Sequence, residues 1–167
     1  MERGLIIDFE GSISQGIREI GFIQLVDYKI QNAGEITVKK EERGFIMSEL
    51  FNDRCDFFVS HNLSTEKNLI KTIMPYPSTL KEKKYRWGPW LDTCYIYKTL
   101  YPNILKYDLK NLALTFSNNH EIDKLANLYC PIGKRTFHHS LYDAICTHLL
   151  IKRLSEKLDL KKFLKSF

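Results

Sequence analysis

The sequence has no apolar run long enough to cross a membrane. None of its hydrophobic stretches approaches the ~18 residues that a transmembrane helix requires. The first residues lack the apolar core and small-residue cleavage site of a signal peptide, and the chain lacks internal repeats, low-complexity tracts and linkers. We therefore expect a cytoplasmic protein without a membrane partner, folded as a single domain over residues 1–167.

Cysteine is scarce, and its spacing fits no zinc-binding pattern. The four cysteines are Cys55, Cys94, Cys130 and Cys146, and each lies among apolar or aromatic neighbours. We therefore expect buried free thiols in a reducing compartment rather than a disulfide framework or a structural zinc site.

Hydrophobic and aromatic residues are plentiful, at 44% and 13% of the chain, so the protein is globular rather than disordered. The net charge is +5. By itself this charge fits any soluble basic protein. Beside a cluster of acids it suits a polyanionic substrate held around a metal site.

Strand patterns come first along the chain, and alternation of strands with helices follows. The predicted strands cover residues 4–9, 16–26, 35–40 and 56–60, with a strand-to-helix passage from Trp90 to Thr93. Two predicted helices begin after caps at Ser64 and Asp108, and two more cover residues 121–128 and 140–154. Residues 45–52 are predicted to form a short helix or a loop. This order predicts an α/β fold with a mixed sheet flanked by helices.

Asp8-Phe9-Glu10 ends the first apolar run and is the first candidate for chemistry. Side chains alternate along a strand, so Asp8 and Glu10 share one face while Phe9 points back to the core. Adjacent carboxylates repel each other unless a cation lies between them, and a divalent metal ion is the usual solution. An isolated pattern of this kind is more often a strand end that leads into a polar loop.

Two further acids lie near predicted helix starts, Glu66 after the buried strand and Asp143 in the first turns of the last helix. Taken alone, each acid is explained by its favourable interaction with the helix dipole and needs no function. Histidines precede both acids, at His61 and at His138-His139. Three acid-bearing segments, each at a strand end or helix start, favour a common site because such ends collect at one edge of a sheet.

The order of these segments resembles that of the DnaQ-like 3′–5′ exonucleases, the DEDDh branch of the RNase H-like superfamily. The segments that carry the resemblance are Asp8-Phe9-Glu10, Ile20-Gly21, His61-Asn62 with Glu66, Leu91-Asp92-Thr93, Leu109 to Ala113, and His138 with Asp143-Ala144. The resemblance implies an RNase H-like sheet with three antiparallel strands followed by parallel ones. It implies a core of about residues 4–154 and a basic helical tail at 155–167.

By this resemblance, two Mg²⁺ or Mn²⁺ ions would serve the attacking and leaving oxygens of a phosphodiester. Asp8, Glu10 and Asp143 would hold the ion on the attacking side, Asp8 would bridge to the second, and Glu66 would contribute through water. The implied activity is 3′–5′ removal of nucleoside monophosphates from single-stranded ends, with DNA slightly favoured over RNA.

The resemblance makes His138 the general base, because an imidazole can accept a proton at neutral pH. Helical geometry favours His139 instead, since His139 and Asp143 are four residues apart and share a helix face. The spacing of the resembling family selects His138, provided that it lies on a lead-in before the helix. We take His138 as the base and keep His139 as the alternative.

Four residues are candidate substrate contacts near the terminal nucleotide, namely Phe9, Gly11, His61 and Asn62. Asn62 is about as well explained as a turn residue, and the segment from Lys81 to Trp90 could stack on a strand or pack as a loop. The sequence departs from the family at Glu66 (usually Asp), Thr65 (often Phe) and Gly11 (often Thr). Coronaviral proofreading exonucleases, which are related, also carry Glu in the Glu66 segment.

Two alternatives to a DNA-directed exonuclease stay open at this point. One is an RNA-trimming or oligoribonuclease-type enzyme on the same fold. The other is a catalytically impaired module that binds nucleic acid or a polymerase. A larger assembly, such as polymerase proofreading or CRISPR adaptation, is a possible context, and the basic tail could dock such a partner.

Overall fold

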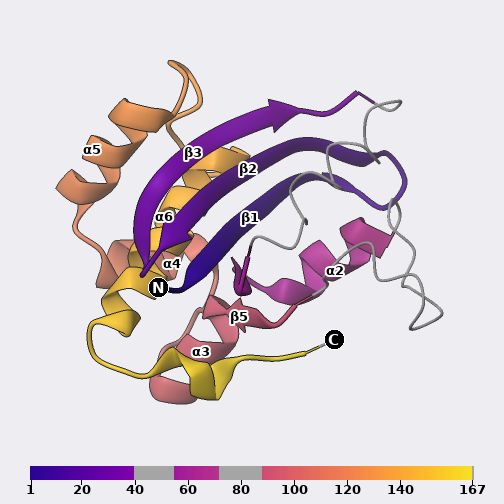
Figure 1. The fold of residues 1–167 in the computed structure, drawn as a ribbon. Coiled ribbons are helices and arrows are strands. Elements are labelled where there is room, and N and C mark those ends of the chain that lie inside the picture. The colour runs from indigo at the N-terminus through magenta and orange to yellow at the C-terminus, as the bar shows by residue number, and fades with distance from the viewer. Residues whose placement is uncertain (40–54, 72–87, 167) are drawn as a thin grey trace.

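One mixed β-sheet forms the centre of the computed structural model, which describes residues 1–39, 55–71 and 88–166 (Figure 1). Its strands are β1 (Arg3–Ser12), β2 (Gly16–Val26), β3 (Lys29–Thr37), β4 (Phe57–Ser60) and β5 (Trp90–Asp92). They lie in the order β3-β2-β1-β4-β5. The first three pair antiparallel, whereas β4 pairs parallel with β1 and β5 pairs parallel with β4. The predicted mixed sheet is thus confirmed.

The third strand was predicted too late in the chain. It covers Lys29–Thr37 rather than residues 35–40, and Asn32, Ala33 and Gly34 pair with β2 instead of forming a turn. The turn lies earlier, at Asp27 and Tyr28, whose φ angles are 47° and 61°. The long ladder with β2 satisfies the backbone polar groups of β3, and this outweighs the local turn preference of Asn and Gly.

Helices cover the sheet on both faces. They are α2 (Leu63–Lys71), α3 (Thr93–Leu100), α4 (Leu109–Phe116), α5 (Asn119–Tyr129), α6 (Ser140–Ser155) and the 3₁₀ helix η2 (Leu160–Phe163). Asp108 caps α4 as predicted, because its carboxylate accepts the Asn111 backbone N–H at 2.9 Å. Within the described ranges, no helix is long and apolar enough to cross a membrane. The expected helix or loop at residues 45–52 lies outside the described residues.

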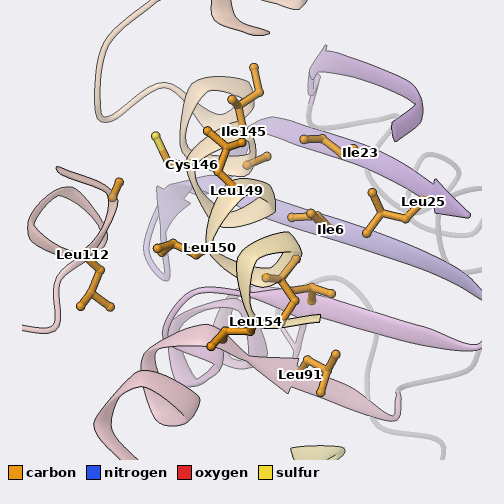
Figure 2. Packing of buried hydrophobic residues seen from close by; sticks show 14 of the residues in the cluster. Ile6, Ile23, Leu25, Leu91, Leu112, Ile145, Cys146, Leu149, Leu150 and Leu154 are labelled. Carbon is orange, nitrogen blue, oxygen red and sulfur yellow. The ribbon is translucent and has the colours of Figure 1, made fainter. Parts of the chain in front are cut away.

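Two hydrophobic clusters pack on opposite faces of the sheet. On one face, Ile6, Ile23, Leu25 and Leu91 meet the buried side of α6 (Figure 2). The predicted stripe of Leu141, Ile145 and Leu149 belongs to this cluster. On the other face, the odd-numbered residues of β1 pack with α2; these are Leu5, Ile7 and Phe9. Even-numbered β1 side chains therefore point toward α6, including Asp8 and Glu10.

Two smaller expectations concern the cysteines and the tail. All four cysteines are free and buried, as predicted. The basic tail packs on its own domain, since Lys165 and Trp90 exchange backbone hydrogen bonds of 2.9 and 2.8 Å. Leu160 of η2 is buried in the larger cluster. The tail thus extends the β5 edge of the sheet, and residue 167 lies outside the described chain.

The first turn of α6 lies directly against β2. A Cβ atom on Gly21 would lie 2.2 Å from the backbone carbon and oxygen of Ser140. Gly21 is paired with Asp8 in the neighbouring strand. The missing side chain at this position therefore allows the start of α6 to approach the acids of β1.

We expect Gly21→Ala to destabilise the protein by about 3 kcal/mol, the upper end of the usual cost of overpacking, because backbone of α6 occupies the space of the new methyl group. Urea unfolding measures the loss. Gly34→Ala is the matched control, since its Cβ would meet the Phe22 ring at 2.9 Å, and a side chain can rotate away. A loss of equal size in both variants would contradict the close approach of α6 to β2.

Candidate active site

A pocket of about 620 Å³ opens at one end of the sheet. It is lined by Asp8, Phe9, Glu10, His61, Asn62, Thr65, Glu66, Cys94, Lys98, Tyr107, Asp108, Leu109, His138 and Asp143. Eight of the nine candidate residues from the sequence are in this set. The ninth, Gly11, is not, because it packs against the start of β2, where a Cβ would lie 2.4 Å from the Gly16 carbonyl oxygen. Segments far apart in the sequence thus meet in one cavity.

The start of α6 is fixed by a carboxylate of β2. Glu19 accepts two hydrogen bonds through Oε1, from the Ser140 backbone N–H at 3.1 Å and from the Ser140 hydroxyl at 2.7 Å. Its other oxygen forms an ion pair with Lys134, which also pairs with Glu35 of β3. The segment that leads into α6 is therefore tied to two strands. Sequence reasoning did not identify Glu19 or Lys134, although Glu19 directly precedes the Ile20-Gly21 pair.

His138 lies beside the acids because it precedes α6 rather than belonging to it. Its φ angle is 70°, and its backbone N–H donates to Asp143 Oδ2 at 3.1 Å. His139 occupies the N-cap position of α6 and makes no side-chain capping bond. The ideal-helix argument that favoured His139 therefore does not apply at His138.

Glu10, His138 and Asp143 form a compact group whose ligand atoms all lie within 4.8 Å of one another. They come from β1, from the lead-in to α6 and from its first turn. Carboxylate oxygens and an imidazole nitrogen at this separation can hold one divalent cation.

Glu66 and Asp143 each bury a carboxylate oxygen that has no hydrogen-bond partner among the described residues. Glu66 is 3% exposed and Asp143 is 9% exposed. An unpaired buried carboxylate oxygen is costly unless a cation satisfies it. The carboxylate oxygens of these acids are hard ligands and therefore fit Mg²⁺ or Mn²⁺.

The carboxyl groups disfavour one another's ionisation. Burial raises the pKa of Asp143 to about 7, and the negative charge of Glu10 acts in the same direction. Burial raises the pKa of Glu66 to about 8. The pKa of Asp8 is raised well above its ordinary value, first by burial and then by the charges of Glu66 and Asp143. Burial also raises the pKa of Glu10. Bound cations would remove this mutual repulsion.

Asp92 joins the starts of two helices. Its carboxylate accepts the backbone N–H groups of Asn62 and Leu63 at 3.1 Å each and that of Tyr95 at 3.2 Å. Asp92 therefore supports the segment that follows β4 and the start of α3. The predicted cap at Ser64 is wrong, because α2 begins at Leu63, and Asp92 accepts the N–H of this first residue.

His61 and Asn62 are fixed in position by hydrogen bonds to neighbouring residues. His61 Nε2 donates to the Tyr107 carbonyl at 2.9 Å, and Nδ1 lies 2.8 Å from the Thr93 hydroxyl. Burial lowers the pKa of His61, so its imidazole is neutral at pH 7. Asn62 has a φ of 61°, which Asn tolerates, and its amide bonds Ser64 and Thr65. These bonds shape the pocket wall.

Of the two interpretations of the segment from Lys81 to Trp90, packing rather than stacking applies to Trp90. Trp90 is fully buried in β5 and packs against Phe58 with ring centroids 5.0 Å apart. It therefore cannot stack on a base. The rest of the segment, residues 81–87, lies outside the described chain.

No family model and no curated protein is similar to this chain, but solved structures are. One, described as exonuclease X in complex with 5′-overhanging duplex DNA, has a TM-score of 0.67 and 19% identity over 96% of both chains. The chain has the fold of the DnaQ-like exonucleases. The RNase domain of the yeast Pop2 protein has a TM-score of 0.56 and 14% identity, over 92% of this chain and 76% of that one. The RNase H-like sheet that the motifs implied is thereby confirmed.

The metal-free protein should lose stability as the pH rises. Asp143 and Glu66 ionise near pH 4 in the unfolded chain, but near pH 7 and 8 in the fold. Between these values the folded state holds protons that the unfolded state has released, so the free energy of unfolding falls with rising pH. Urea titrations in EDTA from pH 5 to pH 8.5 measure this fall.

Glu66→Gln and Asp143→Asn should each make the fall shallower, by up to about 1.4 kcal/mol per pH unit. Glu156→Gln, an exposed acid at the other end of α6, is the control and should follow the wild type. Constant or increasing wild-type stability over this range would contradict the crowding of buried acids.

Proposed function

We propose that the protein is a metal-dependent exonuclease that removes nucleoside monophosphates from the 3′ end of a nucleic acid strand. One observation carries the proposal. Asp8, Glu10, Glu66, Asp143 and His138 meet in one pocket, where two buried carboxylate oxygens lack a partner among the described residues. The fold around this pocket is one that nucleases also have.

The four acids would hold the divalent cations, and Glu10 and Asp143 have ligand atoms within 4.8 Å of a His138 ring nitrogen. When bound, these cations supply electrostatic stabilisation of the charge that develops on the phosphodiester. Cations also let all four carboxylates ionise, which their raised pKa values otherwise oppose. The choice of ion between Mg²⁺ and Mn²⁺ stays a prediction.

His138 would take the proton from the attacking water. Its side chain is exposed at the pocket and close to Glu10 and Asp143. The hydrogen bond between its backbone N–H and Asp143 Oδ2 keeps the imidazole near that carboxylate. The neutral His61, Asn62 and Phe9 would contact the terminal nucleotide.

The substrate is a single strand, and we take DNA as slightly favoured over RNA. The similar structures include one bound to duplex DNA with an overhang and one RNase domain, so both substrates belong in the test. A polymerase or CRISPR-adaptation partner, suggested by the resemblance alone, stays a prediction.

We expect the purified protein to shorten 5′-labelled single-stranded DNA or RNA from the 3′ end in Mg²⁺ or Mn²⁺, and EDTA should abolish the ladder. Asp8→Asn keeps the shape of the side chain and removes its charge. It should lower the rate by at least about 100-fold, because an ionised carboxylate at this position binds the cation.

Binding of Mn²⁺ gives a readout that needs no turnover. Mn²⁺ should raise the melting temperature of the wild type and should do so less in Asp8→Asn. A folded wild type that binds an oligonucleotide without cleaving it would support the impaired binding module instead. Cleavage at internal positions would contradict the 3′ polarity.

Replacing each neighbouring histidine separates their roles. His138→Asn should lower kcat by about 10²–10⁴-fold with little change in KM, as expected for loss of a general base. His139→Asn should retain activity and gain up to about 1 kcal/mol of stability, because Asn is a preferred N-cap and His139 makes no capping bond. Steady-state kinetics and urea unfolding test both, and the reverse pattern would assign the base to His139.

A further inference from the structure

The pocket is strongly acidic and contains a single lysine. Of the described residues that line it, Lys98 is the one Lys or Arg, whereas five carry carboxylates: Asp8, Glu10, Glu66, Asp108 and Asp143. A nucleic acid strand brings one negative charge with each phosphodiester. Cations held by the acids can match the charge of the scissile phosphate, but any further phosphate in the pocket needs another counter-charge.

Lys98 lies away from the acids of β1. It belongs to α3, which follows β5, and β5 is two strands from β1, or about 10 Å. Its side chain is exposed and forms no ion pair with any residue that the structure describes. It hydrogen-bonds the Cys94 thiol, whose pKa is raised by burial, so this partner is neutral and leaves the charge of the ammonium group free to attract an anion that enters the pocket.

Tyr107 holds a fixed aromatic surface beneath this ammonium group. The Lys98 Nζ atom lies 5.6 Å from the centroid of the Tyr107 ring. The Tyr107 hydroxyl donates to the Tyr101 carbonyl at 2.7 Å, and its own carbonyl accepts from His61 and from Cys94 at 2.9 and 3.5 Å. Because both the ring hydroxyl and the backbone carbonyl of Tyr107 are hydrogen-bonded, the ring has a fixed position. It limits where Lys98 can move and lowers the entropy cost of ordering the lysine on a ligand.

We propose that Lys98, backed by Tyr107, binds the phosphate that precedes the scissile one in the substrate strand. This inference rests on the proposed function and narrows its substrate class. A strand with at least two phosphodiesters can use both the acidic end of the pocket and Lys98. A nucleotide ester with one phosphodiester reaches only the acidic end.

Two substrates distinguish binding at Lys98 from binding at the acids of the pocket. One is a 5′-labelled oligodeoxythymidylate, and the other is the p-nitrophenyl ester of thymidine 5′-monophosphate, which has only the scissile phosphodiester. Lys98→Met should raise KM for the oligonucleotide about tenfold and leave hydrolysis of the ester unchanged. Lys98→Arg should restore the oligonucleotide KM. Lys124→Met removes the same charge from the exposed surface of α5, outside the pocket, and should behave as wild type.

Binding measurements keep the inference separate from catalysis. In an Asp8→Asn background, fluorescence anisotropy with the oligonucleotide should show about tenfold weaker binding for Lys98→Met. Loss of one phosphate contact should also reduce the slope of log affinity against log salt by about 0.7. These outcomes support the role of Lys98 even if the wild type hydrolyses neither substrate, a result that would defeat the proposed function alone.

Two results would overturn the inference. Lys98→Met could match Lys124→Met in oligonucleotide affinity and salt dependence, which would make Lys98 a solvated surface residue. Alternatively, Lys98→Met could reduce hydrolysis of the ester as much as that of the oligonucleotide while the melting temperature stays unchanged. That result would place Lys98 at the scissile phosphate or the terminal nucleotide.

Discussion

The close approach of α6 to β2 is the constraint on which the candidate site depends. Backbone of Ser140 occupies the space above Gly21, and Glu19 holds the Ser140 N–H and hydroxyl. Asp8 pairs with Gly21 in the neighbouring strand, so the same contact brings the start of α6 to the acids of β1. Without this approach, Asp143 and His138 would stand one side chain farther from Glu10, beyond the reach of a shared cation.

Glu19 and the acids of the pocket differ in whether a cationic side chain pairs with them. Glu19 has a cationic partner in Lys134, and the pKa of Glu19 is lowered by hydrogen bonds that outweigh its burial. Asp8, Glu10, Glu66 and Asp143 form no ion pair with a described Lys or Arg, and burial raises their pKa values instead. Carboxylates of β1 and β2 thus differ in role through their neighbours rather than through their type. The surrounding core, with α6 buried along most of its length, supplies the stability that such a site lacks.

The part of the pocket formed by α2 and α3 depends on a separate set of hydrogen bonds. Asp92 accepts the first N–H of α2 and caps α3, and His61, which follows β4, donates to the Tyr107 carbonyl. These bonds position α2, which carries Glu66, and α3, which carries Lys98, and both side chains line the same cavity. Asp92 therefore links the position of one acid, Glu66, to that of α3, whereas the other acids depend on β1 and α6.

The sequence by itself determined the alternation along β1, the apolar stripe of α6 and the order of the acid-bearing segments, because each depends on residues close together in the chain. It could not determine the extent of β3, where pairing with β2 outweighed the turn preference of Asn32 to Gly34. Nor could it choose between His138 and His139 from helical geometry, since the left-handed φ of His138 lies outside the helix. The hydrogen bond between Glu19 and Ser140 and the position of Lys98 in the pocket both depend on contacts between residues far apart in sequence. Only the tertiary structure decided these, because packing between elements, and not local propensity, sets which distant side chains meet.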